Sequence, residues 1–222
     1  MTVTRIALLM VLGVSAGCLD SSLGEVPSVD VPASQLGIEP TIVDDTPEAT
    51  DGKVPVSVQF FHSNQFVKLD SAVVRVNGVT LPWSAQGYTA RIPLVAAGGT
   101  ITFEHVRGGT TAQLVYHVPA RPVITSPTTN EVVARLTNVT VMYQSASSSG
   151  VRPLGLDGGN LLASGGEQTD NGMAFLDASG LRPGPGSISV ERRYVTSPPG
   201  GSFLTAAVTY TISSPLIPVS WQ

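Results

Sequence analysis

Side chains that could do acid–base or metal chemistry are few in this sequence of 222 residues. The three histidines, His62, His105 and His117, show none of the short spacings that place two histidines on one metal ion. The one Gly-x-Ser-x-Gly match spans residues 13–17, inside an apolar leading segment rather than at the strand-to-helix turn that this motif needs. No phosphate-binding loop of the Gly-x-x-x-x-Gly-Lys type occurs. The sequence therefore predicts a protein that is not an enzyme, with no metal and no cofactor.

Carboxylates are spread along the chain rather than paired. A glycosidase needs two acids brought about 5 to 10 Å apart. Glu104 and Glu191 occupy equivalent positions in two similar stretches of sequence, so we expect both to face solvent on matching strands instead of meeting across a cleft. The acids of residues 53–222 are Asp70, Glu104, Glu131, Asp157, Glu167, Asp170, Asp177 and Glu191.

Gly-rich turns hold oxygen-bearing side chains of the kind that ligate calcium, namely Asp157, Glu167, Asp170 and Asn171. No twelve-residue loop or repeated spacing accompanies them. Ordinary loop polarity is the favoured interpretation, and a weak calcium site stays an open alternative.

Trp83 is the side chain best placed to contact a ligand. It follows Leu81-Pro82 near the expected end of a strand, where an exposed indole can stack on a sugar ring or on a partner's side chain. Packing against the core is the favoured alternative, and the same choice applies to Trp221. The sequence thus offers Trp83 as a possible ligand contact.

The first seventeen residues have the three parts of a signal peptide. A basic start at residues 1–5 precedes an apolar run over residues 6–14, and Ser15-Ala16-Gly17 supplies the small residues ahead of Cys18. The run is shorter than the roughly 18 to 20 residues of a spanning helix, and we expect none in the mature chain. Export is the expectation, and the single cysteine leaves no partner for a disulfide within one chain.

The position of Cys18 directly after these small residues resembles a bacterial lipobox. In that family the cysteine becomes the lipid-modified first residue of the mature lipoprotein, so the resemblance implies a bacterial source and a membrane anchor on Cys18. The family's sorting rule implies that Leu19 permits passage to the outer membrane. An ordinary secretory signal followed by an incidental cysteine is the alternative.

Residues 18–52 differ in charge from the rest of the chain. From residue 19 to residue 52 there are eight acids and no Lys or Arg, with Pro and Ser throughout, which favours a disordered acidic tether. Residues 53–222 hold eleven Lys or Arg against eight acids, a balance of +3. That balance, without a basic stripe, does not indicate nucleic-acid binding.

The remaining sequence has the pattern of short β-strands. Gly and Pro supply 40 of the 222 residues (23 plus 17), which argues against long helices. Stretches rich in Val, Ile, Thr and aromatics alternate with turn residues, and Asn77-Gly78 is a hairpin signal. In the stretch 114–118 we expect Leu114 and Tyr116 to face inward and His117 to face outward.

Two halves of this region can be laid over each other. Residues 56–62 resemble 139–145, and residues 99–109 resemble 186–195. Residues 76–81 resemble 156–161 and residues 114–118 resemble 208–212, in the same order. An internal duplication explains this order.

The succession Pro-Val-Ile-Thr-Ser-Pro at 122–127, with Gly-Tyr-Thr-Ala-Arg-Ile-Pro-Leu at 87–94, resembles the tandem immunoglobulin-like modules of bacterial surface proteins. The resemblance implies an all-β fold of two β-sandwich modules, which we place at 53–120 and 121–222 after the signal peptide (1–17) and the tether (18–52). We expect a non-catalytic cell-envelope lipoprotein that binds an envelope protein or serves as a spacer. The alternative is a carbohydrate-binding module that uses Trp83.

Overall fold

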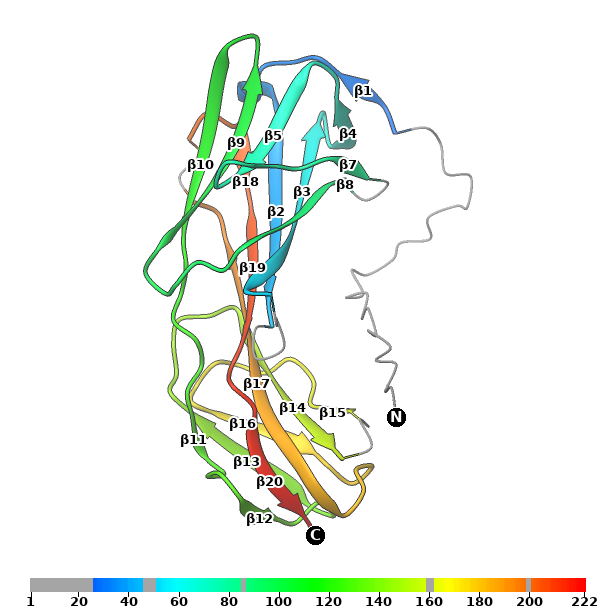
Figure 1. Ribbon diagram of the computed structural model, residues 1–222, viewed down its shortest axis with the longest axis vertical. Helices are drawn as coiled ribbons and strands as arrows, with labels where there is room; N and C mark the ends of the chain where they lie inside the picture. The colour runs from blue at the N-terminus through cyan, green and yellow to red at the C-terminus, as the bar shows by residue number, and fades with distance from the viewer. Residues whose placement is uncertain (1–25, 46–50, 85–86, 159–161, 199–200) are drawn as a thin grey trace.

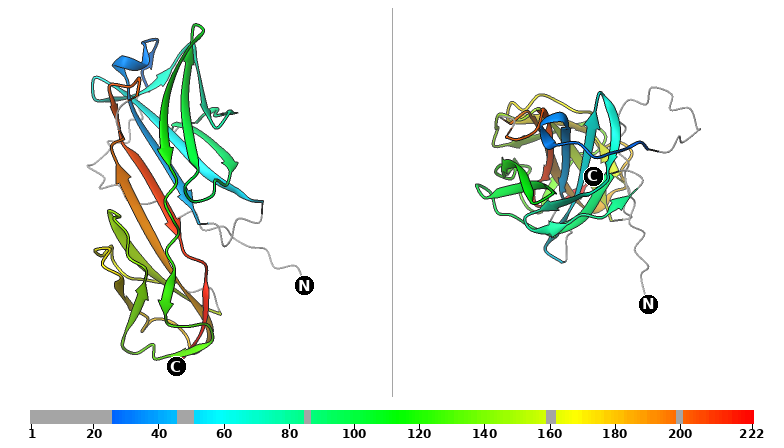
Figure 2. Two further views of the ribbon diagram at one scale, coloured as in Figure 1. Left: turned by 90° about the vertical axis from the view of Figure 1, so that its left-hand side faces the viewer. Right: turned by 90° about the horizontal axis from the view of Figure 1, so that it is seen from above.

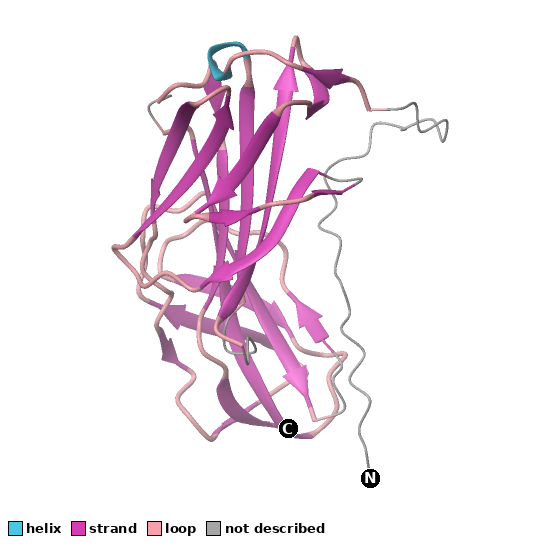
Figure 3. Ribbon diagram, turned by 45° about the horizontal axis from the view of Figure 1, so that its top comes forward, coloured by secondary structure: helices cyan, strands magenta, loops and turns pink. Residues whose placement is uncertain are grey.

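The structure is a computed structural model that describes residues 26–45, 51–84, 87–158, 162–198 and 201–222. Cys18 and the predicted signal peptide lie outside these residues. The expected fold class is confirmed, because the described residues form strands with one short 3₁₀ turn, η1 (Ala33–Gln35), and no α-helix (Figure 3). Within the part of the chain described, no helix is long and apolar enough to cross a membrane.

The strands, in chain order, are β1 (Ser28–Val29), β2 (Gly37–Asp44), β3 (Lys53–His62), β4 (Gln65–Leu69), β5 (Ala72–Val76), β6 (Val79–Thr80), β7 (Trp83–Ser84), β8 (Gly87–Pro93), β9 (Thr100–Arg107), β10 (Thr110–His117), β11 (Ile124–Ser126), β12 (Glu131–Val133), β13 (Asn138–Tyr143), β14 (Gly150–Asp157), β15 (Leu162–Ser164), β16 (Met173–Asp177), β17 (Gly184–Thr196), β18 (Thr205–Ala206), β19 (Val208–Ser213) and β20 (Ile217–Trp221). They build two units, one above the other along the long axis of the molecule (Figure 1).

The first unit is a sandwich of two sheets around a large apolar core. One sheet has β3 in its middle, with β2 on one side and both β4 and β8 on the other. The opposite sheet runs in the order β10-β9-β5-β6. Alternation of apolar and polar residues directs one face of each strand inward, as expected for half-buried strands. On β10 this buries Leu114 and Tyr116 and exposes His117, so the prediction for these three residues is confirmed.

The second unit repeats this strand order with shorter sheets. A three-stranded sheet β11-β13-β16 corresponds to β2-β3-β8, and β15-β14-β17-β20 corresponds to β6-β5-β9-β10. Two of the matching stretches in the sequence fall on corresponding strands, 56–62 and 139–145 on β3 and β13, and 99–109 and 186–195 on β9 and β17. The predicted match of 114–118 with 208–212 is wrong, because the first stretch lies on β10, which corresponds to β20, whereas the second lies on β19 beside β2. Residues 159–161 of the fourth match lie outside the described residues. The strand pairing therefore agrees with the predicted duplication for two of the four stretches.

The predicted boundary between residues 53–120 and 121–222 is wrong in one respect. The core of the first unit includes Tyr194, Phe203, Ala206, Val208, Tyr210 and Ile212, which all lie within the range predicted for the second module. The reason is that β17 extends beyond its own unit and returns as β19, which pairs in parallel with β2 (Figure 2). The first unit is therefore completed by the C-terminal part of the chain.

The predicted disordered tether is also wrong for residues 26–45. β2 occupies the middle of a sheet between β3 and β19, and Leu36, Ile38 and Ile42 are buried. Alternation of apolar residues over this stretch gives it an inward face, although the high net charge of the whole segment obscured the pattern.

The charges that favoured disorder have partners in the fold. Asp30 forms an ion pair with Arg107, and Asp51 forms one with Arg91. The hydrogen bond from each arginine lowers the pKa of the carboxyl that it contacts. Asp30 and Asp51 are thus compensated by basic residues of the region 53–222, which lowers the self-repulsion expected from the sequence.

Candidate functional site

The two units meet at a joint formed by β17, β19 and β2. Gly184–Ile188 of β17 pair with β20 in the second unit, whereas Glu191–Thr196 pair with β19. β19 in turn pairs with β2 of the first unit, from Thr209 opposite Thr41 to Ile212 opposite Asp44. A hairpin of the second unit thus becomes part of a sheet of the first.

A buried carboxylate ties the ends of β2 and β19 together. Asp44 is 1% exposed, and its Oδ1 lies 2.5 Å from Nη2 of Arg121, in the segment that connects the units. Tyr210 of β19 donates its hydroxyl to Asp44 Oδ2 at 3.2 Å. Arg121 also donates through Nη1 to the carbonyl oxygen of Ser213 at 2.9 Å. Three chain segments therefore meet at one charged contact.

Two stacked tyrosines continue this contact into the core of the first unit. The rings of Tyr116 and Tyr210 lie 5.5 Å apart at an angle of 22°. Burial raises the pKa of Tyr116 to about 12, and burial together with the Asp44 charge raises the pKa of Tyr210. Both hydroxyls therefore stay protonated at physiological pH, as Tyr210 must to donate to Asp44.

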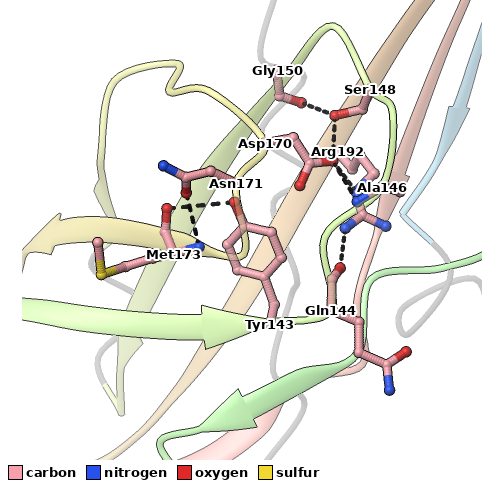
Figure 4. A network of polar contacts seen from close by, with 9 residues as sticks. All are labelled: Tyr143, Gln144, Ala146, Ser148, Gly150, Asp170, Asn171, Met173 and Arg192. Carbon is pink, nitrogen blue, oxygen red and sulfur yellow. Dashed lines mark hydrogen bonds and ion pairs between the residues drawn. The ribbon is translucent and has the colours of Figure 1, made fainter.

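A second buried ion pair lies where β17 changes partner. Arg192 Nε is 2.9 Å from Asp170 Oδ2, and both side chains are 2% exposed (Figure 4). Ser148 donates to the same carboxylate oxygen at 2.6 Å, and Arg192 donates to the carbonyl oxygen of Gln144. The guanidinium also lies over the ring of Tyr143, 5.7 Å from its centroid. Arg192 thereby fixes two loops of the second unit to β17.

This network bears on the open calcium alternative. The guanidinium of Arg192 already supplies a positive charge to Asp170, and Asn171 uses its side-chain oxygen to accept the backbone N–H of Met173 at 3.1 Å. Asp157 is buried and accepts the backbone N–H of Arg182. Among the described residues no group of three or more His, Cys, Asp and Glu side chains is arranged to hold a metal ion.

Glu104 and Glu191 lie on the corresponding strands β9 and β17, as predicted, but both are half-buried instead of fully facing solvent. Each has a neighbour on its own sheet. Glu104 accepts from the side-chain amide of Gln113 at 2.9 Å. Arg152 donates to both carboxylate oxygens of Glu191, at 2.8 and 3.0 Å. Two cavities of about 210 and 200 Å³ lie beside Glu191. Glu167 also lines the first cavity, and its Oε2 lies 3.6 Å from Nη1 of Arg193. Both acids at this cavity therefore have a basic partner.

The histidines lie apart in the first unit. His117 is exposed and His62 is half-buried at the end of β3. His105 is buried between the rings of Phe60 and Phe203, 6.1 and 6.5 Å away, and burial lowers its pKa. His105 therefore stays neutral in a largely aromatic setting.

Trp83 lies in a half-buried aromatic cluster at one side of the first unit. Its ring stacks on Phe66 with centroids 5.5 Å apart and meets the edge of Tyr88 at 5.1 Å. Phe61 extends the row beyond Phe66, at 6.0 Å. Trp83 thus packs against the core and still exposes part of its indole to solvent. Trp221 is different, because it is 1% exposed and donates its indole N–H to the carbonyl oxygen of Leu156.

Sequence reasoning missed the residues that build the joint. Arg121 and Arg192 were counted only toward net charge, and Asp44 was assigned to the tether. The one available signal was the alternation of Leu36, Ile38 and Ile42 ahead of Asp44, which is the pattern of a strand. A pairing over more than 160 residues, such as that of β2 with β19, leaves no local trace in a single sequence.

Comparison with known proteins gives similar solved structures but no family. A scan against protein-family models finds no match, and neither does a search of curated proteins. Among solved structures, the BSP domain of a biofilm-associated protein is 16% identical over 80% of this chain, with a TM-score of 0.26, and the chain spans only 29% of that protein. Domains 4 and 5 of the S-layer protein SbsC are 14% identical (86% of this chain, 99% of the other, TM-score 0.25). A 1.5-MDa bacterial ice-binding adhesin is 17% identical (87% and 67%, TM-score 0.23). At TM-scores this low, the likenesses carry no argument about function.

Proposed function

We propose that the protein is a non-catalytic lipoprotein of the bacterial cell envelope whose two immunoglobulin-like units form a stiff spacer that presents a surface to another envelope component. The observation that carries this proposal is the hairpin of β17 and β19, which belongs to sheets of both units. A spacer needs a joint that resists bending, and two strands shared between units provide more resistance than a single connecting segment.

The positions of the chain ends support the same role. β1, the first described strand, lies at the outer end of the first unit, and the C-terminal residue lies at the opposite end of the second (Figure 1). An anchor on Cys18 would hold the first unit near the membrane and place the second farther away. The segment after Cys18 begins with Leu19, which fits residence in the outer membrane.

Replacing Cys18 tests the anchor. Cys18→Ser should move the protein from the membrane fraction to the soluble fraction of cells, because no acyl chain can then be attached. Ser21→Ala is the matched control and should leave the protein with membranes. Continued membrane residence of the Cys18→Ser variant would contradict the anchor.

The partner can be sought with the lipidated, tagged protein by cross-linking in cells and mass spectrometry. Recovery of one defined envelope protein, with cross-links confined to one face, would support presentation of a binding surface. Recovery of nothing above background would argue against a binding surface and leave the role of passive spacer.

Carbohydrate binding is the second candidate, and the exposed part of Trp83 favours it. Stacking on Phe66 fixes the orientation of the indole, and the part of the half-buried ring that stays exposed is apolar surface on which a sugar ring can stack. Trp83→Ala should then abolish retention on the cognate glycan column, whereas Phe175→Ala, at an exposed aromatic residue of the second unit, should not. Equal retention of wild type and Trp83→Ala would exclude this candidate.

A further inference from the structure

The first long strand of the chain and the last strand of the first unit lie side by side and run in the same direction. Thr205 and Ala206 of β18 pair with Gly37 and Ile38, and β19 continues the parallel pairing along β2 as far as Ile212 opposite Asp44. We propose that this parallel pair is a mechanical clamp that resists tension between the two ends of the chain.

The direction of the two strands decides how tension acts on them. Tension from the N-terminal side reaches β2 at Gly37, whereas tension from the C-terminal side reaches β19 at Ser213. Since the strands are parallel, these are opposite ends, and the strands are drawn past each other along their length. Hydrogen bonds between strands lie across that direction, so the bonds of the pair share the load. Strands drawn apart from one shared end would instead lose their bonds one after another.

The register of the paired region has a gap at two residues of β2, Glu39 and Pro40. The backbone N–H of Ala207 donates to the carbonyl oxygen of Ile38, which shows that Ile38 directs its peptide groups toward β19. By alternation along the strand, Pro40 has the same orientation but has no N–H to donate. Pairing is interrupted at this position and resumes at Thr41. The clamp therefore has two paired stretches.

The second stretch ends in a set of polar contacts between β2, β19 and Arg121, which we call the cross-tie. Arg121 contacts the carboxylate of Asp44 on β2 and the carbonyl oxygen of Ser213 on β19, while Tyr210 of β19 donates to the same carboxylate. Sliding of β19 along β2 must break these contacts as well as the backbone bonds. Because Asp44 is buried, its separation from Arg121 and Tyr210 would leave a charge without compensation.

The second unit gains a role from this arrangement. Its C-terminal strand β20 follows β19 directly, so a pull on the second unit is transmitted into the pair that closes the first. The use of the clamp in cells rests on the proposed envelope anchor, whereas its mechanical strength is a property of the isolated protein.

Single-molecule force spectroscopy tests the clamp by changing where the load enters. Cys18 is the only cysteine, so the whole unlipidated chain with one cysteine added after Gln222 can be held by both ends. In a second chain, Cys18→Ser is combined with Lys53→Cys, at the exposed start of β3. Load then enters the first unit at the joint, and β2 is not drawn at Gly37. We expect the first unit to unfold at a severalfold higher force in the end-to-end geometry.

Two further variants examine the cross-tie in the end-to-end geometry. Arg121→Gln should lower the unfolding force of the first unit. Arg91→Gln, which removes a similar ion pair with exposed Asp51 outside the clamp, should not. Equal unfolding forces for the two geometries would overturn the proposal. Since this result does not depend on lipidation, it is separate from the fractionation of the Cys18→Ser variant, which alone tests the anchor.

Discussion

The two units share one strand order and differ in how their sheets are completed. In the second unit, β20 lies beside the N-terminal half of β17, and the core contains only residues from Val133 to Trp221. In the first unit, the sheet that begins with β3 and β2 is extended by β19, from the far end of the chain. The comparison shows that the folding units are not contiguous in sequence. The first unit depends on residues 194–212, which lie in sequence between two strand segments of the second unit, the start of β17 and β20.

Three of the residues that the first unit receives are aromatic, namely Tyr194, Phe203 and Tyr210. Phe203 lies 6.3 Å from Phe60 and 6.5 Å from His105, and Tyr210 stacks on Tyr116. Each unit also has an ion pair with a buried carboxylate, Asp44 with Arg121 in the first and Asp170 with Arg192 in the second. The received aromatic residues therefore distinguish the first unit, whereas a buried charge is common to both.

Removal of a received aromatic residue should have the largest effect on the first unit. Phe203→Ala should lower the free energy of unfolding by about 3–5 kcal/mol because it leaves a cavity in the core. Hydrogen exchange should then speed up in β3 and β9, although Phe203 lies between β17 and β19 in sequence. Faster exchange confined to β13 and β16 would contradict the assignment of Phe203 to the first core.

Removal of the buried arginine should cost the second unit a similar amount. Arg192→Met leaves Asp170 buried without its cation, a change that typically costs about 3–5 kcal/mol. Adding Asp170→Leu should recover most of this loss, since no unpaired charge then remains. Chemical denaturation of both variants measures the difference, and an absence of recovery would show that the arginine acts through contacts other than Asp170.

A smaller effect is expected from the hydroxyl that joins the units. Tyr210→Phe keeps the ring stacked on Tyr116 but removes the donor to Asp44, which should cost about 1–3 kcal/mol. Tyr194→Phe, on the neighbouring strand, is the control without a bond to Asp44. Equal stability of Tyr210→Phe and wild type would mean that the Asp44 contact adds nothing to the joint.

The smallest effect should appear as a pH dependence of the first unit. Burial lowers the pKa of His105 below its usual 6.5, so the unfolded chain binds a proton in a range where the folded chain does not. The free energy of unfolding should therefore be highest above pH 6.5 and should decrease as the pH falls below that value. His105→Phe should weaken this decrease, while His117→Gln at an exposed position should keep it. Identical pH profiles for wild type and His105→Phe would exclude a contribution from His105.

Residue patterns within short stretches of the sequence predicted the features that depend on neighbouring residues, such as the strands and their inward faces. Alternation identified the strands and the outward position of His117, and the weak internal similarity matched β3 with β13 and β9 with β17. The same reasoning assigned Asp44 to a disordered tether, because its partner Arg121 lies 77 residues away. Charge counted over a segment does not show which acids meet a distant base.

The joint could not be predicted for a related reason. β17 reads as one long strand in sequence, and nothing in its residues indicates that it changes partner between Ile188 and Glu191. For Trp83 the sequence left two alternatives, an exposed ligand contact and the favoured packing against the core, because its neighbours in sequence define only a strand end. Its stacking on Phe66 required the fold.

The central claim is that the shared hairpin makes one rigid body of the two units. Backbone N–H residual dipolar couplings of the aligned protein test it directly. The account predicts that the couplings of β3, β5 and β9 and those of β13, β14 and β16 fit a single alignment tensor. Two tensors of different magnitude, one for each unit, would contradict it, because they would mean that the units reorient independently despite the pairing of β19 with β2.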